Sequence, residues 1–120
     1  MTGIDTVDVD GWEVLVGRSA KANDRLSLRD ARPRDLWLHA AGFAGSHVVI
    51  RCPDGEEPPR EVVERAARLA IHHSKARNAG GKVEVHVCRA ADVSKARGAP
   101  AGQVRIRDWW AVRVYPEKTG

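Results

Sequence analysis

The chain has 120 residues and a mass of 13.2 kDa, which is the size of one domain. Hydrophobic residues make up 42% of it and charged residues 30%, a balance typical of globular proteins and not of disordered chains. Two cysteines are too few for a disulfide framework or a four-cysteine zinc site, and the acidic N-terminus fits neither a secretory signal nor a transit peptide. We therefore expect a reduced, cytoplasmic domain with no membrane partner, no metal and no cofactor.

Positive charge is unevenly distributed along the chain. The formal net charge is +4, yet residues 1–16 hold four acids and no base, whereas residues 71–107 hold eight bases and two acids. Fifteen of the 20 basic residues are arginine, whose planar guanidinium matches phosphate groups and stacks on bases. This pattern favours a polyanionic partner such as nucleic acid. The alternative is a solvated, arginine-rich surface without such a partner.

The first half of the chain predicts three strands and a short helix. Residues 1–11 form an acidic N-terminal segment, and we place the domain itself at residues 12–116. Residues 12–16 are predicted as the first strand and residues 19–30 as a helix that begins at a serine and ends before a proline. Alternating apolar residues predict strands at 35–40 and 46–51, followed by a proline-rich loop at 53–59.

The second half predicts one long helix and three further strands. Charged residues recur at spacings of three and four over residues 60–77, opposite an apolar face, which predicts an amphipathic helix. Strands are predicted at 82–88, 103–107 and 110–115, with a basic loop at 90–102. The expected fold is α+β: a mostly antiparallel sheet of about five to six strands, with the long helix and the short N-terminal helix packed on it.

One predicted strand carries an acid, an indole and an imidazole on the same face. Asp35, Trp37 and His39 alternate with apolar residues, so all three point to one side of the strand. Tryptophan can stack on a nucleobase, and histidine can contact phosphate. The alternative is that Trp37 fills a second apolar layer and Asp35 satisfies His39. We favour packing for Trp37 and a binding role for His39.

Gly45, Ser46 and His47 open the next predicted strand. Adjacent strand residues point to opposite faces, so Ser46 and His47 cannot form a nucleophile and base pair with each other. We expect Gly45 to allow an unusual backbone angle, and Ser46 and His47 to flank backbone amides that could receive an anion.

Basic side chains cluster at the end of the long helix and in the segments after it. The adjacent pair His72 and His73 has a poor spacing for metal ligation, and neither a P-loop nor a Rossmann glycine motif is present. The candidate phosphate contacts are Ser74, Lys75 and Arg77 from the helix end, Lys95 and Arg97 from the basic loop, and Arg105 and Arg107 from a strand.

The order of these motifs resembles the NFACT RNA-binding domain. The resemblance is carried by residues 16–24, 35–39, 45–49, 70–76 and 93–102, and it runs from about residue 12 to about residue 116. Leu38 stands where the family often has phenylalanine, and histidines stand at 72 and 73 where aromatic residues are common. The family motifs map onto residues 35–39 and 45–48, onto Ser74 and Lys75, and onto Lys95, Gly98 and Gly102. The residues expected to be structural are Asn23, Asp35, Trp37, Gly45, Gly98 and Gly102.

The resemblance implies a function for the chain. Larger members of the family are ribosome-associated quality-control factors that engage tRNA and the large ribosomal subunit. It therefore implies a stand-alone, non-catalytic domain that binds structured RNA, either tRNA or ribosomal RNA, with His39, Ser46 and His47 at the central site.

Two alternatives from other classes stay open. One is an enzyme that uses Asp35, His39 and His47 as acid–base groups on a phosphodiester or nucleotide. The other is a protein-docking module whose partner surface contains Trp109 and Trp110. The sequence leaves the oligomeric state open.

Overall fold

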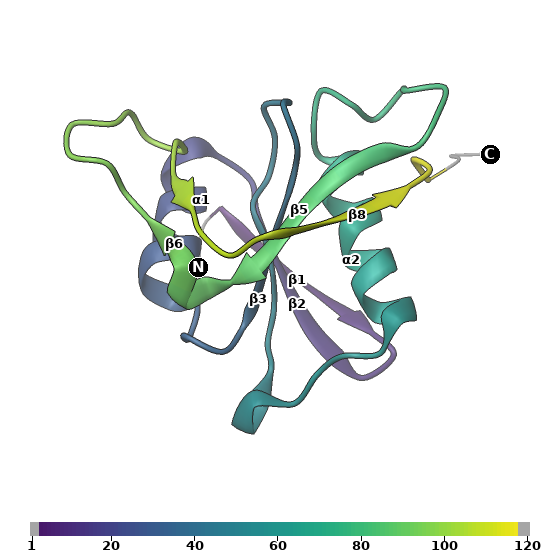
Figure 1. Cartoon of the computed structure of the whole chain (residues 1–120), viewed down its shortest axis with the longest axis horizontal. Helices are drawn as coiled ribbons and strands as arrows, with labels where there is room; N and C mark the ends of the chain where they lie inside the picture. Colours follow the sequence, from purple (N-terminus) through teal and green to yellow (C-terminus); the bar gives the residue numbers. More distant parts are fainter. Residues whose placement is uncertain (1–2, 118–120) are drawn as a thin grey trace.

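One antiparallel sheet of six strands runs through the part of the chain that the computed structural model describes, residues 3–117 (Figure 1). The order across the sheet is β1-β2-β4-β3-β5-β8. A separate two-stranded ribbon pairs β6 with β7. The predicted α+β class is therefore confirmed. The strands are β1 (Ile4–Val9), β2 (Trp12–Gly17), β3 (Leu36–Ala40), β4 (Val48–Ile50), β5 (Val83–Arg89), β6 (Val93–Ser94), β7 (Arg105–Ile106) and β8 (Trp110–Val114).

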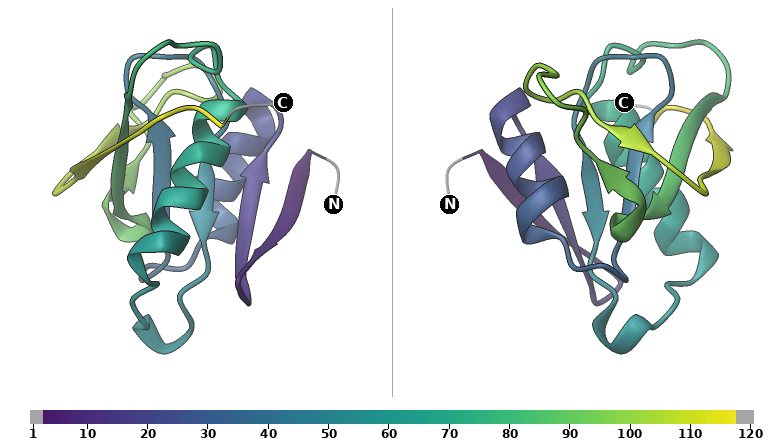
Figure 2. Two further views of the ribbon diagram at one scale, coloured as in Figure 1. Left: turned by 90° about the vertical axis from the view of Figure 1, so that its right-hand side faces the viewer. Right: turned by 60° about the vertical axis from the view of Figure 1, so that its left-hand side comes forward.

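The two helices lie on opposite faces of the sheet (Figure 2). Helix α2 (Arg60–His72) covers one face. Helix α1 (Ala20–Arg25) continues into a π-helical turn, η1 (Leu26–Asp30), and covers the other face together with the β6–β7 ribbon. Two apolar layers result. The α2 layer includes Val16, Leu36, Leu38, Ile50 and Val85, and the α1 layer consists of Leu15, Leu26, Trp37, Val49, Cys88 and Val93.

The sheet begins earlier than the expected boundary at residue 12. β1 lies within the acidic segment and pairs with β2 along its whole length. Asp10 and Gly11 form the two-residue turn between them, and both have a positive φ (51° and 88°), the geometry that closes a tight hairpin. Alternating acids conceal the strand in the sequence. Residues 1 and 2 of that segment lie outside the described residues.

Helix α2 ends at His72 instead of the predicted residue 77, because residues 73–75 pair with another loop. The amide of Ser46 donates to the carbonyl of His73 (3.0 Å), and the amide of Lys75 donates to the carbonyl of Ala44 (2.9 Å). Gly45 lies against Ser74 so closely that a Cβ on Gly45 would come within 2.4 Å of the Ser74 Cβ. Gly45 therefore permits a close approach of two backbone segments. The expectation of an unusual backbone angle at Gly45 is wrong, since its φ is not positive.

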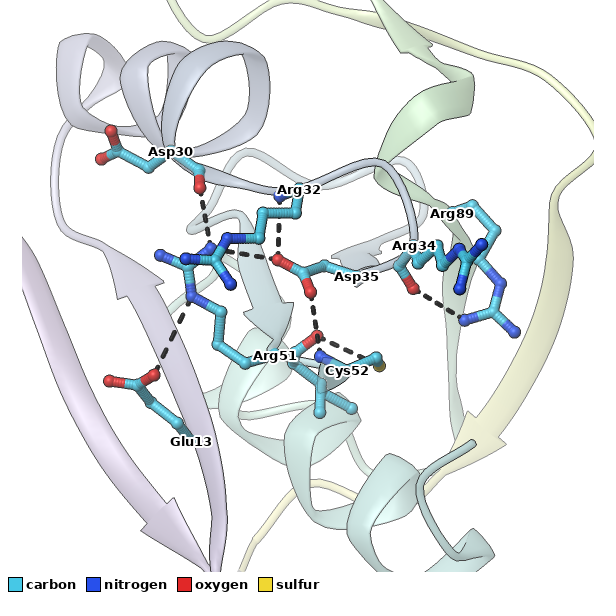
Figure 3. Close-up of polar contacts among 9 residues, drawn as sticks. Glu13, Asp30, Arg32, Arg34, Asp35, Arg51, Cys52 and Arg89 are labelled. Carbon is cyan, nitrogen blue, oxygen red and sulfur yellow. Dashed lines mark hydrogen bonds and ion pairs between the residues drawn. The ribbon is translucent and has the colours of Figure 1, made fainter. Parts of the chain in front are cut away.

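Asp35 joins three segments at the opposite end of the sheet (Figure 3). Its side chain is almost fully buried and accepts hydrogen bonds from the amide of Arg32 (2.9 Å), the amide of Cys52 (2.9 Å) and Nη1 of Arg51 (3.0 Å). The same Arg51 nitrogen donates to the carbonyl of Asp30 (2.7 Å). The carboxylate thus ties the end of η1 to the end of β4.

We expect Asp35→Asn to lower the free energy of unfolding by about 3 kcal/mol, because it removes the nearer of the two carboxylates beside the partly buried Arg51 and leaves only Glu13, at 3.9 Å. Urea unfolding of the purified domain measures the change. Glu56→Gln, which removes an exposed charge, is the matched control and should change stability by less than about 0.5 kcal/mol. Equal stabilities of the two variants would contradict a structural role for Asp35.

Candidate nucleic-acid interface

Three loops gather at one end of the sheet: residues 41–47, 73–82 and 95–104 (Figure 1, upper part). On the α1 face, residues from all three loops and the start of α1 line a hollow of about 700 Å³. Four histidines line this hollow, so we call it the imidazole pocket: His39, His47, His73 and His86. Apolar and backbone atoms supply much of the remaining lining, from residues such as Ala44, Gly45, Gly102, Val104 and Ile106.

A second hollow of about 720 Å³ adjoins the imidazole pocket. We call it the basic hollow, because Arg18, Lys75 and Arg77 line it. Lys75 and Arg77 are exposed, and neither makes an ion pair within residues 3–117. No aspartate or glutamate of the described chain lines either hollow. The hollows share a wall of five residues: Arg18, Ala44, Gly45, Ser46 and His73.

His47 is buried in a chain of hydrogen bonds. Nε1 of Trp37 donates to Oγ of Ser27 (2.8 Å), which lies 2.7 Å from Nδ1 of His47. Because the carbonyl of Gly102 can only accept, Nε2 of His47 carries the ring proton toward it (3.2 Å). In the neutral ring Nδ1 then accepts the hydroxyl proton of Ser27, whose oxygen accepts from Trp37. Burial, and to a lesser degree the nearby His39, lower the pKa of His47 to about 4. His47 is therefore neutral and joins the 95–104 loop to the sheet.

Asn23 and Ser46 complete the support of the pocket wall. Asn23 accepts the amide proton of His47 (3.0 Å) and donates to the carbonyl of Gly45 (3.2 Å). The amides of Ser46 and His47 are thus both occupied, so the anion-binding amide cluster expected there is wrong. Ser74 is also buried, and its hydroxyl donates to the carbonyl of Ile71 (2.7 Å).

Lys95 is a clamp within the protein. Its ammonium group contacts the carboxylate of Asp24 (3.0 Å) and the carbonyls of Pro100 and Gln103 (2.9 Å for Gln103). The same carboxylate accepts the amide proton of Gly102 (3.0 Å). All three ammonium protons are used in this way, so the phosphate contact predicted for Lys95 gives way to a role in shaping the loop.

The other predicted residues are only partly brought together. His39 is half-buried in the imidazole pocket, and Trp37 packs beneath it with ring centroids 5.9 Å apart, as the packing interpretation predicts. Asp35 lines neither hollow, so the acid–base group of Asp35, His39 and His47 is not assembled. Exposed arginines that also line neither hollow are Arg97, Arg105 and Arg107; Arg107 lies 3.9 Å from Asp92.

Sequence reasoning did not assign Arg18 or His86 to this site, and it named Trp109, which contacts His86 but lines neither hollow, only for a protein-docking surface. Arg18 lies on the shared wall, and its guanidinium contacts Asp5 (2.6 Å). His86 lies directly opposite His39 in the pairing of β3 with β5, and its ring packs against Trp109 with centroids 4.1 Å apart. Alternation along β5 could have placed His86 on the face opposite its valines, whereas the contact with Trp109 depends on strand register. Trp109 and Trp110 are both exposed, by 47% and 43%.

The chain is similar to a known family of domains. The model of the NFACT protein RNA binding domain matches residues 5–108. The chain belongs to the NFACT RNA-binding domain family. The Rqc2 homolog RqcH of Streptococcus suis is 39% identical over 103 residues, covering 86% of the chain and 18% of that protein. The RqcH of Bacillus subtilis is 36% identical over 107 residues, covering 89% of the chain and 18% of that protein.

A eukaryotic relative and a solved structure are also similar to this NFACT domain. The ribosome quality control complex subunit NEMF homolog of Drosophila melanogaster is 32% identical over 97 residues, which is 81% of the chain and 10% of that protein. The domain thus spans a fifth or less of these relatives. The solved C-terminal part of the fibronectin/fibrinogen-binding protein of Streptococcus suis has a TM-score of 0.88 and 35% identity, covering 98% of the chain and 47% of that structure.

The described residues contain neither a membrane-spanning helix nor a metal-binding cluster. Within residues 3–117 of this NFACT domain, no helix is long and apolar enough to cross a membrane. In the same range, no group of three or more His, Cys, Asp or Glu side chains is arranged to hold a metal ion.

We expect the ring of His47 to stay neutral from pH 7 to about pH 5, with its proton on Nε2, because its pKa is lowered from 6.5 to about 4. Between pH 6.5 and about pH 4, His47 binds a proton in the unfolded chain but not in the folded chain. The free energy of unfolding therefore falls as the pH drops from 6.5 toward 4, by up to about 3 kcal/mol from this residue. Nitrogen-15 NMR of the imidazole checks the tautomer and midpoint, and a midpoint near 6.5 would contradict the network.

We expect Lys95→Met to lower the free energy of unfolding by about 2 kcal/mol and to speed hydrogen exchange of the Gly102 amide, because the loop loses its clamp. Urea unfolding and NMR-detected exchange measure the two effects. Arg97→Met removes an exposed charge from the same loop and serves as the control. If both variants leave Gly102 equally protected, Lys95 does not shape the loop.

Proposed function

We propose that this domain binds structured RNA, tRNA or ribosomal RNA, without catalysing a reaction, and that it acts in association with the ribosome in translation quality control. The observation that carries the proposal is the basic hollow beside the imidazole pocket, with no carboxylate lining either of them among the described residues. The description of the matching family and the names of the relatives support the same direction.

Lys75 and Arg77 are the proposed phosphate contacts. Both side chains are exposed and unpaired within residues 3–117, so binding a phosphate breaks no ion pair there. The basic hollow that they line also receives Arg18, whose partner Asp5 is an exposed residue of β1. Folded RNA is recognised largely through its shape and backbone, and a rigid surface with fixed cations suits such a ligand.

The burial of His47 limits how it can take part. Both ring nitrogens are occupied within the protein, so its proposed role is to hold the wall of the pocket while His39 faces the ligand. Ser46 and Ser74 support the same wall from the shared loop contact. The catalytic alternative needs the carboxylate of Asp35 at the imidazole pocket, but this carboxylate binds Arg51 and Cys52 at the other end of the sheet. Its absence from the pocket favours binding over acid–base chemistry.

The names of the relatives also suggest the partner. RqcH is described as a homolog of Rqc2, and the fly relative as a subunit of the ribosome quality control complex. We therefore propose the large ribosomal subunit as the place of action and the cytoplasm as the compartment. Crosslinking in cells followed by sequencing of the bound RNA distinguishes tRNA from ribosomal RNA.

We expect Lys75→Ala combined with Arg77→Ala to weaken binding of a folded tRNA about tenfold, because two phosphate contacts are lost. The slope of log affinity against log salt should fall by about 1.5 for the same reason. Fluorescence anisotropy at several salt concentrations measures both quantities.

A second double variant, Arg60→Ala with Arg113→Ala, is the matched control. It removes the same charge from another hollow, which both residues line next to Glu64. It should keep more affinity and a steeper salt slope than the first variant. Equal losses in the two double variants would mean that only net charge matters, and absence of RNA binding by the unaltered domain would refute the proposed function.

A further inference from the structure

The two hollows differ in the chemistry that they offer. We propose that the imidazole pocket takes one unstacked nucleobase, while the basic hollow takes a phosphate next to it; this rests on the proposed function and adds the class of RNA that it prefers. Such a base is extrahelical in folded RNA or belongs to a single-stranded segment, and both present the same flat, neutral, hydrogen-bonding group.

The lining of the imidazole pocket suits a neutral group. Arg18 on the shared wall is its only charged side chain among the described residues, and it is paired with Asp5. Burial lowers the pKa of both His39 and His47, so the inner rings are uncharged at neutral pH. A phosphate placed there would lose its water without gaining a free cation, whereas a base keeps its apolar faces out of water.

His39 has unused hydrogen-bonding capacity. Its ring is half-buried and lines the pocket, yet its nitrogens make no hydrogen bond within residues 3–117. By contrast, His47 is bonded at both nitrogens, and His86 contacts the carboxylate of Glu84 (3.1 Å). A neutral imidazole offers one donor and one acceptor, which complement the edge of a base. The nitrogens of His39 are not among the fully buried atoms of the described residues, so this ring can bond a ligand in the pocket without breaking a bond inside the protein.

Flat rings extend from the pocket to its rim. His39 lies beside His86 in the sheet, and the ring of His86 packs against Trp109 at a centroid distance of 4.1 Å and an interplanar angle of 35°. Trp109 is nearly half exposed although it is the most hydrophobic type of ring. Stacking of a base on such a ring is sequence-tolerant, since every base has a π face.

The shared wall makes the two hollows direct neighbours. Gly45 and Ser46 belong to both linings, with the imidazole pocket on one side and Lys75 and Arg77 on the other. A base can therefore occupy the first hollow while a phosphate of the same strand occupies the second. Continuous duplex RNA cannot do this, because its bases are stacked inside the helix.

The test compares two RNAs, each with an abasic counterpart, by fluorescence anisotropy with the full domain. The first is a hairpin with a single-nucleotide bulge, whose counterpart has an abasic residue at the bulge, and the second is an unstructured oligonucleotide with its own abasic counterpart. We expect the base to strengthen binding about tenfold over its abasic counterpart. A gain confined to the bulge identifies an extrahelical base, and a gain in the oligonucleotide identifies a single-stranded one.

Two variants assign the gain to the pocket. Trp109→Ala and His39→Phe should each reduce the base-dependent gain to less than threefold, the second while keeping a ring in place. Trp110→Ala is the matched control, because Trp110 is equally exposed but pairs with Val87 on the α2 face of the sheet. It should keep the full gain. Thermal unfolding verifies that the variants fold, and the exposed position of Trp109 makes its variant informative even if His39→Phe unfolds.

The outcomes separate this inference from the proposed function. If the unaltered domain binds the bulged and abasic RNAs equally, the pocket does not take a base, although RNA binding stands. If Trp110→Ala removes the gain as strongly as Trp109→Ala, the base does not lie in the imidazole pocket. The double variant of Lys75 and Arg77 should weaken all the RNAs alike and leave the base-dependent gain unchanged.

Discussion

The ion pair between Lys95 and Asp24 is the interaction on which the site depends. It joins the 95–104 loop to α1, and the same carboxylate fixes the amide of Gly102, whose carbonyl in turn receives the ring proton of His47. Gly102 has a φ of 85°, and a Cβ there would come within 3.2 Å of Ala20, so the loop packs tightly on the helix. A cation thus shapes a neutral pocket whose other wall is formed by the sheet.

The burial of polar groups explains why the two hollows have different chemistry. The face between α1 and the sheet contains Ser27, Trp37 and His47, and each satisfies the next by hydrogen bonding. Such a network disfavours charge, because burial penalises an imidazolium at His47 and a proton on Nδ1 would turn the Ser27 hydroxyl proton away from the ring. Cations gather where the backbone of residues 73–75 leaves α2 and returns to solvent. The polypeptide thereby separates the buried imidazole rings from the exposed cations.

Alternation and helical spacing predicted most of the fold, including the two faces of β3 and the burial of Trp37. They failed where the deciding contact is distant in sequence. The sequence pattern misses β1 although Asp10 and Gly11 signal a hairpin turn. It also extends α2 to residue 77, because the pairing of residues 73–75 with residues 44–46 leaves no local signal in the sequence. Charge alone could not tell that Lys95 binds Asp24, and the position of His86 beside Trp109 follows only from strand register.

The spacing of Asn23 and Ser27 has a consequence for how the chain length can vary. The two residues lie one helical turn apart and bind the same histidine. Asn23 accepts the backbone amide proton of His47, and Ser27 bonds to its ring. Adding or deleting one residue between them would rotate one side chain by about 100° away from His47. Related domains should therefore accept insertions at the tip of the loop around Gly98, where the chain faces open space, and should keep the number of residues between these two positions constant.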